Sequence, residues 1–151
     1  MLRVEEKPLL ILIEDDLESL MHAHWEECSI DRQEVPFSPD WQTALRLERD
    51  GVLHAFGLFH DGELVGYAVF EVFQHLHFKT TKHAACSGIY IRPECRKGAA
   101  GLKLFVDSEA LLKRLGVKKI GYQAPFASNL NKVLEKGGYR PSETLYTKMV
   151  A

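Results

Sequence analysis

Apolar residues recur along the chain with two different periods, which divide it into predicted strands and helices. The run Leu9–Ile13 stands between a proline and three acidic residues, a pattern typical of a short strand followed by a helix start. Between Leu17 and Cys28, apolar residues return every three or four positions and predict an amphipathic helix. A second helix is expected to begin after Ser38 or Asp40, either of which can cap it, and to reach about Arg49.

Two longer apolar segments, Val52–Phe59 and Leu64–Phe73, flank a turn that contains Asp61–Gly62. Asp-Gly is a favoured pair for the positive φ angles of a two-residue hairpin turn, so these segments predict two antiparallel strands. A polar turn is expected next at Lys79–Lys82, and it is followed by a predicted strand over Ala84–Ile91.

The last third of the chain predicts four more elements. A wide arc of apolar residues over Ala99–Leu115 is typical of a helix packed on a sheet, and a glycine ends it. The other elements are a strand over Lys118–Ala124, a helix capped by Ser128 that reaches Lys136, and a final strand around Thr144–Val150. The chain has no repeat, linker or low-complexity segment, so residues 1–151 are predicted to form one mixed α/β domain.

Charge and cysteine content narrow the classes of partner. The chain has 19 Lys and Arg residues against 21 Asp and Glu, a formal net charge of −2, which favours neither nucleic acid nor an anionic membrane. The three widely spaced cysteines, Cys28, Cys86 and Cys95, predict a reducing, cytoplasmic location without a disulfide framework. The N-terminal residues resemble neither a signal peptide nor a membrane span.

A basic loop of small residues joins the predicted strand Ala84–Ile91 to the next helix. Small side chains let backbone N–H groups approach an anion, and the first helical turn adds unpaired amides and the positive end of its dipole. Arg96 and Lys97 add positive charge at the rim of this loop. Neither the nucleoside triphosphate signature G-x-x-x-x-G-K-[ST] nor the dinucleotide signature G-x-G-x-x-G is present, so a different phosphorylated cofactor is expected.

The spacing Arg96-x-x-Ala99-x-Gly101 resembles the acyl-CoA pyrophosphate signature of GNAT-type N-acetyltransferases, Gln/Arg-x-x-Gly-x-Gly/Ala, with alanine at the first glycine. Other segments are also similar to parts of that superfamily: Ile89–Pro93, Leu115–Ile120 and Leu134–Tyr139. The order of the predicted elements agrees with the family over nearly the whole chain. The resemblance implies a GNAT-like α/β fold, with a central, mostly antiparallel sheet, splayed fourth and fifth strands, and about four flanking helices.

The same resemblance implies acetyl-CoA as the cofactor and assigns its contacts. Its pyrophosphate is expected on the loop and the first helical turn, at Arg96, Lys97, Gly98, Ala99, Ala100, Gly101 and Leu102. The pantetheine arm is expected along main-chain groups of Ile89, Tyr90 and Ile91. Asn129 either adds a hydrogen bond to the cofactor or is a simple cap or turn residue. Enzymes of this type often dimerise, so a homodimer is one expected assembly.

The residue that protonates the departing thiolate is less clearly marked. Many members of the family carry a tyrosine for this role on the helix that precedes the closing segment, and Leu134 stands at that position here. Tyr122 and Tyr146 are the nearest substitutes by strand placement.

Three candidate proton acceptors follow from the alternation of side chains along a strand. If the strand that begins at Leu64 is regular, Glu71, His75 and His77 lie on one face. Histidine suits the task because its unperturbed pKa of ~6.5 lies near neutral pH. The alternative is that these side chains occupy a solvated end of the strand.

The first two helices border the acceptor in folds of this type, so Trp25, Glu26 and Glu27 are candidates for recognising a cationic amine, unless they serve only packing and solvation. His22 and Glu26 share a helix face, but without a third ligand no metal site is predicted. The leading hypothesis is an acetyl-CoA-dependent N-acetyltransferase that acts on a small-molecule or peptide amine by direct transfer in a ternary complex. The alternative is a catalytically silent acyl-CoA-binding or protein-interaction module with the same fold.

Overall fold

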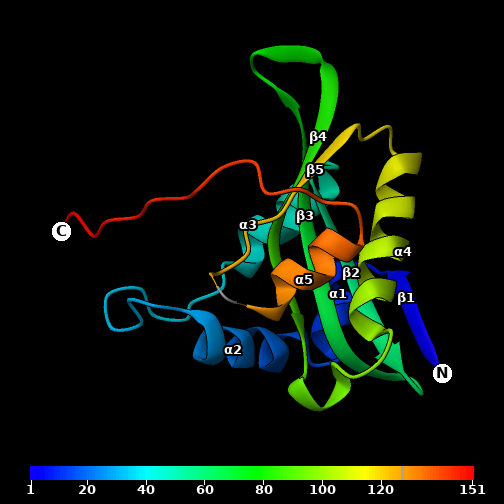
Figure 1. Cartoon of the computed structure of the whole chain (residues 1–151). Coiled ribbons are helices and arrows are strands. Elements are labelled where there is room, and N and C mark those ends of the chain that lie inside the picture. The colour runs from blue at the N-terminus through cyan, green and yellow to red at the C-terminus, as the bar shows by residue number, and fades with distance from the viewer. Residues whose placement is uncertain (127) are drawn as a thin grey trace.

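A single five-stranded sheet forms the centre of the computed structural model, which describes residues 1–126 and 128–151 (Figure 1). Its strands follow one another in sequence order: β1 (Leu2–Glu6), β2 (Leu53–His60), β3 (Glu63–His75), β4 (Phe78–Ile91) and β5 (Lys119–Gly121). Neighbouring strands are antiparallel except β4 and β5, which are parallel. The expected mixed, mostly antiparallel sheet is therefore confirmed.

Helices cover both faces of this sheet. One face carries α1 (Leu9–Glu14), α2 (Leu17–Cys28) and α3 (Trp41–Arg49), and the other carries α4 (Ala100–Arg114), against which α5 (Asn129–Lys136) packs; a short 3-10 helix, η1, spans Pro93–Cys95. Each face has its own apolar core, one centred on Phe56 and Phe70 beneath α4, and one in which Leu12 of α1 and Leu17 of α2 pack against the sheet. Among the described residues, no helix is both long and apolar enough to span a membrane.

The first predicted strand, Leu9–Ile13, is wrong, because these residues form helix α1. The N–H groups of Ile11 and Leu12 donate to the carbonyl of Pro8, and Leu9 N donates to Glu48 Oε2 at 2.7 Å, so the helix start is satisfied. Leu9 and Leu12 are buried while the two residues between them are exposed, which is a helical spacing hidden in an unbroken apolar run. The true first strand is β1, which pairs with β2.

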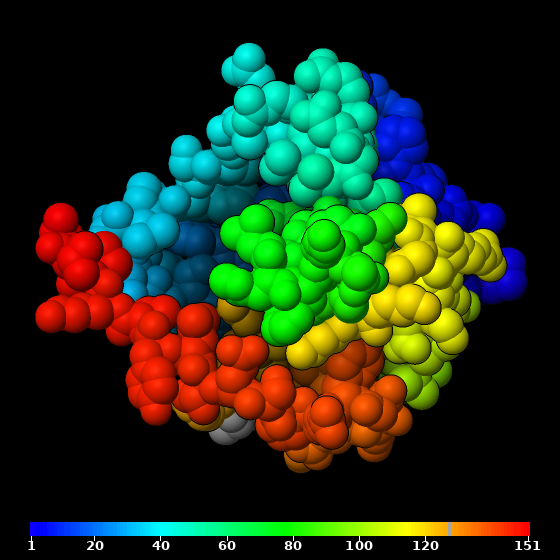
Figure 2. Space-filling view, turned by 90° about the horizontal axis from the view of Figure 1, so that it is seen from above, coloured from blue at the N-terminus to red at the C-terminus, as the bar shows by residue number. Residues whose placement is uncertain are grey.

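The predicted hairpin at Asp61–Gly62 is confirmed, and both residues have positive φ angles, 49° and 88°. The polar turn predicted at Lys79–Lys82 is wrong, since the β3–β4 ladder continues to the pair His75 and Phe78 and the chain reverses at Leu76–His77. The tip of this long hairpin rises above the rest of the molecule in Figure 1, and it forms the green region at the centre of the face seen from above in Figure 2.

The final strand predicted around Thr144–Val150 is also absent from the described residues. The chain beyond Tyr139 leads away from the sheet without regular structure, and Tyr146 is 88% exposed (Figure 1). The strand predicted over Lys118–Ala124 is shorter in the structure, where β5 covers only Lys119–Gly121. It therefore offers little edge for another strand to join.

Candidate functional site

The edge of β4 that faces β5 is open along Cys86–Ile91, the last six of the strand's 14 residues. β4 and β5 pair only from His83 to Ala85, the last pair being Ala85 with Gly121, and among the described residues no strand continues along the β5 side of Cys86–Ile91. The predicted splaying of these two strands is thus confirmed. An open edge presents unpaired N–H and C=O groups, to which an extended ligand can add in the manner of a strand.

A β-bulge lies where this open edge begins. Val69 pairs with Gly88 and Phe70 pairs with Cys86, so Ser87 is an extra residue on β4. Its hydroxyl donates to the carbonyl of Val69 at 3.3 Å. A bulge bends its strand and redirects the groups next to it, and bulges are common beside active sites.

The other end of the open edge, at Ile91, leads into the basic loop that is predicted to bind an anion, which we call the anion loop (residues 92–99). After Ile91 the chain forms η1, turns at Gly98 with a φ angle of 75°, and enters the 15-residue helix α4. The first turn of α4 has no side-chain cap and no acidic residue. Its leading amides and the positive end of its dipole are therefore free to hold an anion.

Arg96 is not a free cation at the rim of this loop. Its Nη1 and Nη2 donate to Glu27 Oε1 and Oε2 at 2.7 and 2.5 Å, and its Nε donates to the carbonyl of Ile91 at 2.8 Å. Its guanidinium also lies over the ring of Tyr90, 5.2 Å from the centroid. The arginine predicted to face the cofactor and the glutamate predicted to face the acceptor are thus partners, and they tie the loop to α2.

This pair predicts a pH-dependent contribution to stability. The hydrogen bonds from Arg96 hold the pKa of Glu27 below its ordinary value of 4.5. The pair therefore stabilises the folded protein above about pH 4.5, and this stabilisation disappears as the pH falls through the lower folded pKa. Glu27→Gln should lower the free energy of unfolding by ~0.5–1 kcal/mol at pH 7, because both side chains are more than a third exposed.

Urea unfolding at pH 7 and pH 3 measures this effect, with Glu26→Gln as the control on the neighbouring exposed carboxylate. A loss that is equal at both pH values would contradict the role of the charged pair.

A second cluster joins α2 to the sheet beside the bulge. His24 Nδ1 lies 2.6 Å from the hydroxyl of Tyr67 on β3, and its ring stacks on Tyr90 of β4 with the centroids 5.1 Å apart. Burial lowers the pKa of His24 and raises the pKa of Tyr67, so both groups are uncharged at neutral pH. His24 is not among the site residues predicted from the sequence. Its place among the apolar positions of the predicted helix Leu17–Cys28 was the available signal, because a histidine on an apolar helix face needs a polar partner.

Tyr122 lies just past the point where β4 and β5 separate. Its ring packs against Phe70, Phe105 and Tyr139. Its hydroxyl is buried and has no hydrogen-bond partner among the described residues. Burial, followed by the nearby Tyr139, raises its pKa far above the ordinary value, so the phenol keeps its proton. Buried polar groups are normally satisfied, which makes this hydroxyl a candidate ligand contact.

The other predicted catalytic residues differ in how near they lie to this region: the partner of Glu71 on β4 directly precedes the open edge, whereas His75, His77 and Tyr146 are distant from it. Glu71 is exposed and pairs with Ala85, while His75 and His77 are at the hairpin tip, where their rings lie near each other and near His83. Eight residues separate Tyr67 from His75 along β3, roughly 26 Å. The structure therefore separates these histidines from the loop, and it places Tyr146 on the exposed C-terminal segment.

The remaining predicted site residues have local partners or none. Trp25 Nε1 donates to the carbonyl of Val35 at 3.3 Å, and Glu26 lies 3.8 Å from His22. Asn129 begins α5 and makes no side-chain hydrogen bond to the described residues. The turn before this helix is held instead by Asn131, whose amide donates to the carbonyls of Pro125 and Ser128. No group of three or more potential metal ligands occurs in the part of the chain that the structure describes.

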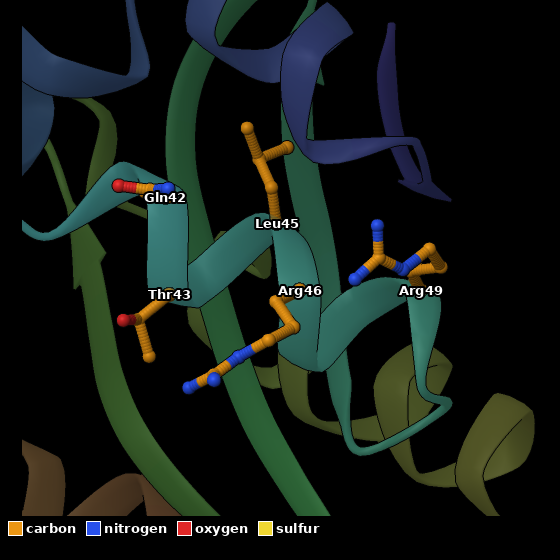
Figure 3. Close-up of a pocket in the computed structure, with 5 residues that line it drawn as sticks. All are labelled: Gln42, Thr43, Leu45, Arg46 and Arg49. Atoms are coloured by element: carbon orange, nitrogen blue, oxygen red, sulfur yellow. The ribbon is translucent and has the colours of Figure 1, made fainter.

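A surface hollow elsewhere on the molecule is formed by a single helix. Figure 3 shows its lining on α3: Gln42, Thr43, Leu45, Arg46 and Arg49. None of these residues belongs to the open β4 edge or to the anion loop, so the hollow has no place in the candidate site.

The sequence profile of the Acetyltransferase (GNAT) family matches residues 17–133. The match covers more than half of the chain, and the protein therefore belongs to this family of acetyltransferases. No curated protein matches it.

Solved structures share the fold at low sequence identity. An aminoglycoside acetyltransferase, meta-AAC0020, from an uncultured soil metagenomic sample, in complex with sisomicin, is 16% identical with a TM-score of 0.74 over 99% of this chain and 95% of that one. The ribosomal-protein-alanine N-acetyltransferase from Brucella melitensis biovar Abortus 2308 is 18% identical, with a TM-score of 0.74 over all of both chains. A predicted acetyltransferase with acetyl-CoA from Clostridium acetobutylicum is 12% identical, with a TM-score of 0.67 over 99% and 97%. At these identities the likeness establishes the fold alone.

Proposed function

We propose that the protein is an acetyl-CoA-dependent N-acetyltransferase that transfers the acetyl group directly to a primary amine in a ternary complex. The observation that carries this proposal is the open β4 edge that runs from the bulge at Ser87 to the uncapped first turn of α4. Family membership supports the reaction type, and the neighbour solved with acetyl-CoA supports the donor.

The donor site would use the two ends of this edge for different parts of the cofactor. The pyrophosphate would lie on the amides from Lys97 to Leu102, and the pantetheine amides would bond to main-chain groups of Ile89–Ile91. Asn129, at the start of α5, makes no side-chain hydrogen bond to the described part of the chain and would offer its amide for one further hydrogen bond. Bound acetyl-CoA supplies the activated acyl group, and these residues bind and orient it.

Direct transfer agrees with the protonation state of Cys86, the cysteine at the start of the open β4 edge. Desolvation of the partly buried thiol raises the pKa of Cys86 to about 12, so it is protonated at neutral pH and is a poor nucleophile. The amine nitrogen would therefore bond to the thioester carbonyl carbon itself, and the carbon–sulfur bond would break. Tyr122, whose neutral hydroxyl has no hydrogen-bond partner within residues 1–126 and 128–151, is our candidate to protonate the departing thiolate.

The acceptor would approach from the α2 side of the sheet, where Trp25, Glu26 and Glu27 lie on one helix. The acceptors named for the neighbours are an aminoglycoside and a ribosomal protein's alanine, so amines of both kinds are appropriate probes. His75, His77 and Tyr146 receive no role in this scheme because they lie far from the open edge, while Glu71, which pairs with Ala85 beside the start of that edge, stays a predicted proton acceptor.

The test is calorimetric titration with acetyl-CoA, followed by a thiol-release assay with sisomicin, spermidine and a peptide that begins with alanine. We expect a dissociation constant between ~1 μM and ~1 mM and release of CoA with at least one amine. Binding without release by any amine would favour the catalytically silent acyl-CoA-binding alternative, which Leu134 at the usual acid position supports. No binding at millimolar acetyl-CoA would overturn the proposal.

A further inference from the structure

We infer that His24 is the proton acceptor for the incoming amine and that the hydroxyl of Tyr67 positions it; this inference rests on the proposed acetyl transfer. Neither residue belongs to the loop or to the set of catalytic candidates that the sequence suggested.

The pair lies beside the open β4 edge at its bulged end. A Cβ added at Gly88 would lie 3.6 Å from the hydroxyl of Tyr67 and 3.4 Å from its ring, so the tyrosine covers the residue that follows the bulge. A ligand anchored at the first turn of α4 and extended along β4 meets the bulge at Ser87, four residues from Ile91 and roughly 13 Å away. The pair is therefore next to the acyl end of such a ligand.

Packing fixes the imidazole on two sides. The ring of Tyr90 stacks beneath it at an interplanar angle of 18°, and the Tyr67 oxygen holds Nδ1 at 2.6 Å. Both tyrosines are almost fully buried, at 7% and 3% exposure, so the contacts are rigid. His24 itself is only partly buried, and its Nε2 has no hydrogen-bond partner among the described residues.

Charged and titratable groups approach His24 from each neighbouring element: Glu27 from α2, Arg96 from the loop, Tyr67 from β3 and Tyr90 from β4. Burial is the largest influence and lowers the pKa of His24; Arg96 lowers it further, and Glu27 opposes both. The imidazole is thus neutral at pH 7. When Nδ1–H donates to the Tyr67 oxygen, the lone pair of Nε2 is available as a base held by a third group.

The proton balance is complete with the groups present. Nε2 of His24 takes one proton from the substrate ammonium, which frees the nitrogen lone pair. The nitrogen then bonds to the thioester carbon, the carbon–sulfur bond breaks, and the second proton of the nitrogen replaces the one that Tyr122 gives to the thiolate. His24 releases its proton to solvent, and Glu27 stabilises the imidazolium while it exists.

The first test is His24→Asn, compared with His22→Asn on the exposed side of the same helix. Asparagine can still donate to the Tyr67 oxygen but cannot accept a proton at neutral pH. With the amine that gives CoA release, we expect kcat to fall by ~10²–10³-fold and the acidic limb of kcat/KM, below pH 6.5 in the wild type, to disappear. The dissociation constant for acetyl-CoA should stay within about twofold, and His22→Asn should behave as wild type.

The second test needs no acceptor. The ¹⁵N resonances of the His24 ring report its pKa and tautomer, and we expect a pKa below 6.5 with the proton on Nδ1. Tyr67→Phe should mix the tautomers and lower kcat less than His24→Asn does.

Turnover by His24→Asn equal to wild type, with the acidic limb intact, would overturn the role of His24 while leaving the acetyltransferase proposal in place. An imidazolium at pH 7 or a proton fixed on Nε2 would also overturn it. Failure of the wild type to bind acetyl-CoA would remove both proposals together.

Discussion

Gly101→Glu is expected to weaken acetyl-CoA binding by about 100-fold or more, equivalent to about 2.7 kcal/mol. Gly101 is the second residue of α4, so the new carboxylate would lie among the amides that are proposed to hold the pyrophosphate. A Cβ at this position would lie 3.7 Å from Val133 of α5, an ordinary contact, so the backbone accommodates the change. A glutamate in the first helical turn also interacts favourably with the positive end of the helix dipole. Stability should therefore be kept while binding is lost.

Calorimetry with acetyl-CoA measures the loss, and thermal unfolding checks that the variant is folded. The matched control is Val106→Glu, which adds the same charge to an exposed position farther along α4 and should bind as wild type does. Equal affinities for the wild type and for both variants would show that the first turn of α4 does not hold the pyrophosphate.

Phe70→Ala is expected to lower the free energy of unfolding by about 3–5 kcal/mol, a large share of the ~5–15 kcal/mol typical of a domain. Phe70 is fully buried on the α4 face of β3, and its ring makes edge-on contacts with Phe56 and Tyr122 at centroid distances of 5.6 and 5.7 Å. Its loss opens a cavity between rings that cannot close fully, and it removes one wall around the ring of Tyr122.

Urea unfolding measures this change, with Phe70→Leu as the volume-conserving control, expected to cost about 1.5 kcal/mol or less. An unchanged dependence of the unfolding free energy on urea would show that the folded core alone is affected. A loss below about 1 kcal/mol for Phe70→Ala would contradict the central place of Phe70 in this core.

Local patterns predicted the elements whose periodicity is long enough to decide between helix and strand. Helix α2, helix α4 and the hairpin at Asp61–Gly62 follow from spacing or turn chemistry alone. The run Leu9–Ile13 did not, because five consecutive apolar residues carry no period and the helix is settled by tertiary contacts such as that with Glu48. The segment Thr144–Val150 has the composition of a strand, but within the described chain it pairs with no strand of the sheet.

The candidate site also has one part that the sequence predicted and another that it did not. Order along the chain predicted the loop and the first turn of α4, because strand, loop and helix are contiguous. The partners that complete the site are distant in sequence: 43 positions separate His24 from Tyr67, and 69 separate Glu27 from Arg96. A single sequence contains no local signal for such pairs, and only the packing of α2 on the sheet brings them together.

The bond between Arg96 and Glu27 joins the loop on the proposed donor side to the helix on the proposed acceptor side. A phosphate that draws Arg96 toward the loop would leave the carboxylate of Glu27 unpaired and facing a cationic amine. Thermodynamic linkage then requires that each ligand raise the affinity for the other by the same factor. On the proposed sites, this one ion pair would make donor and acceptor heterotropic effectors of each other, and the pair is closed in the ligand-free protein.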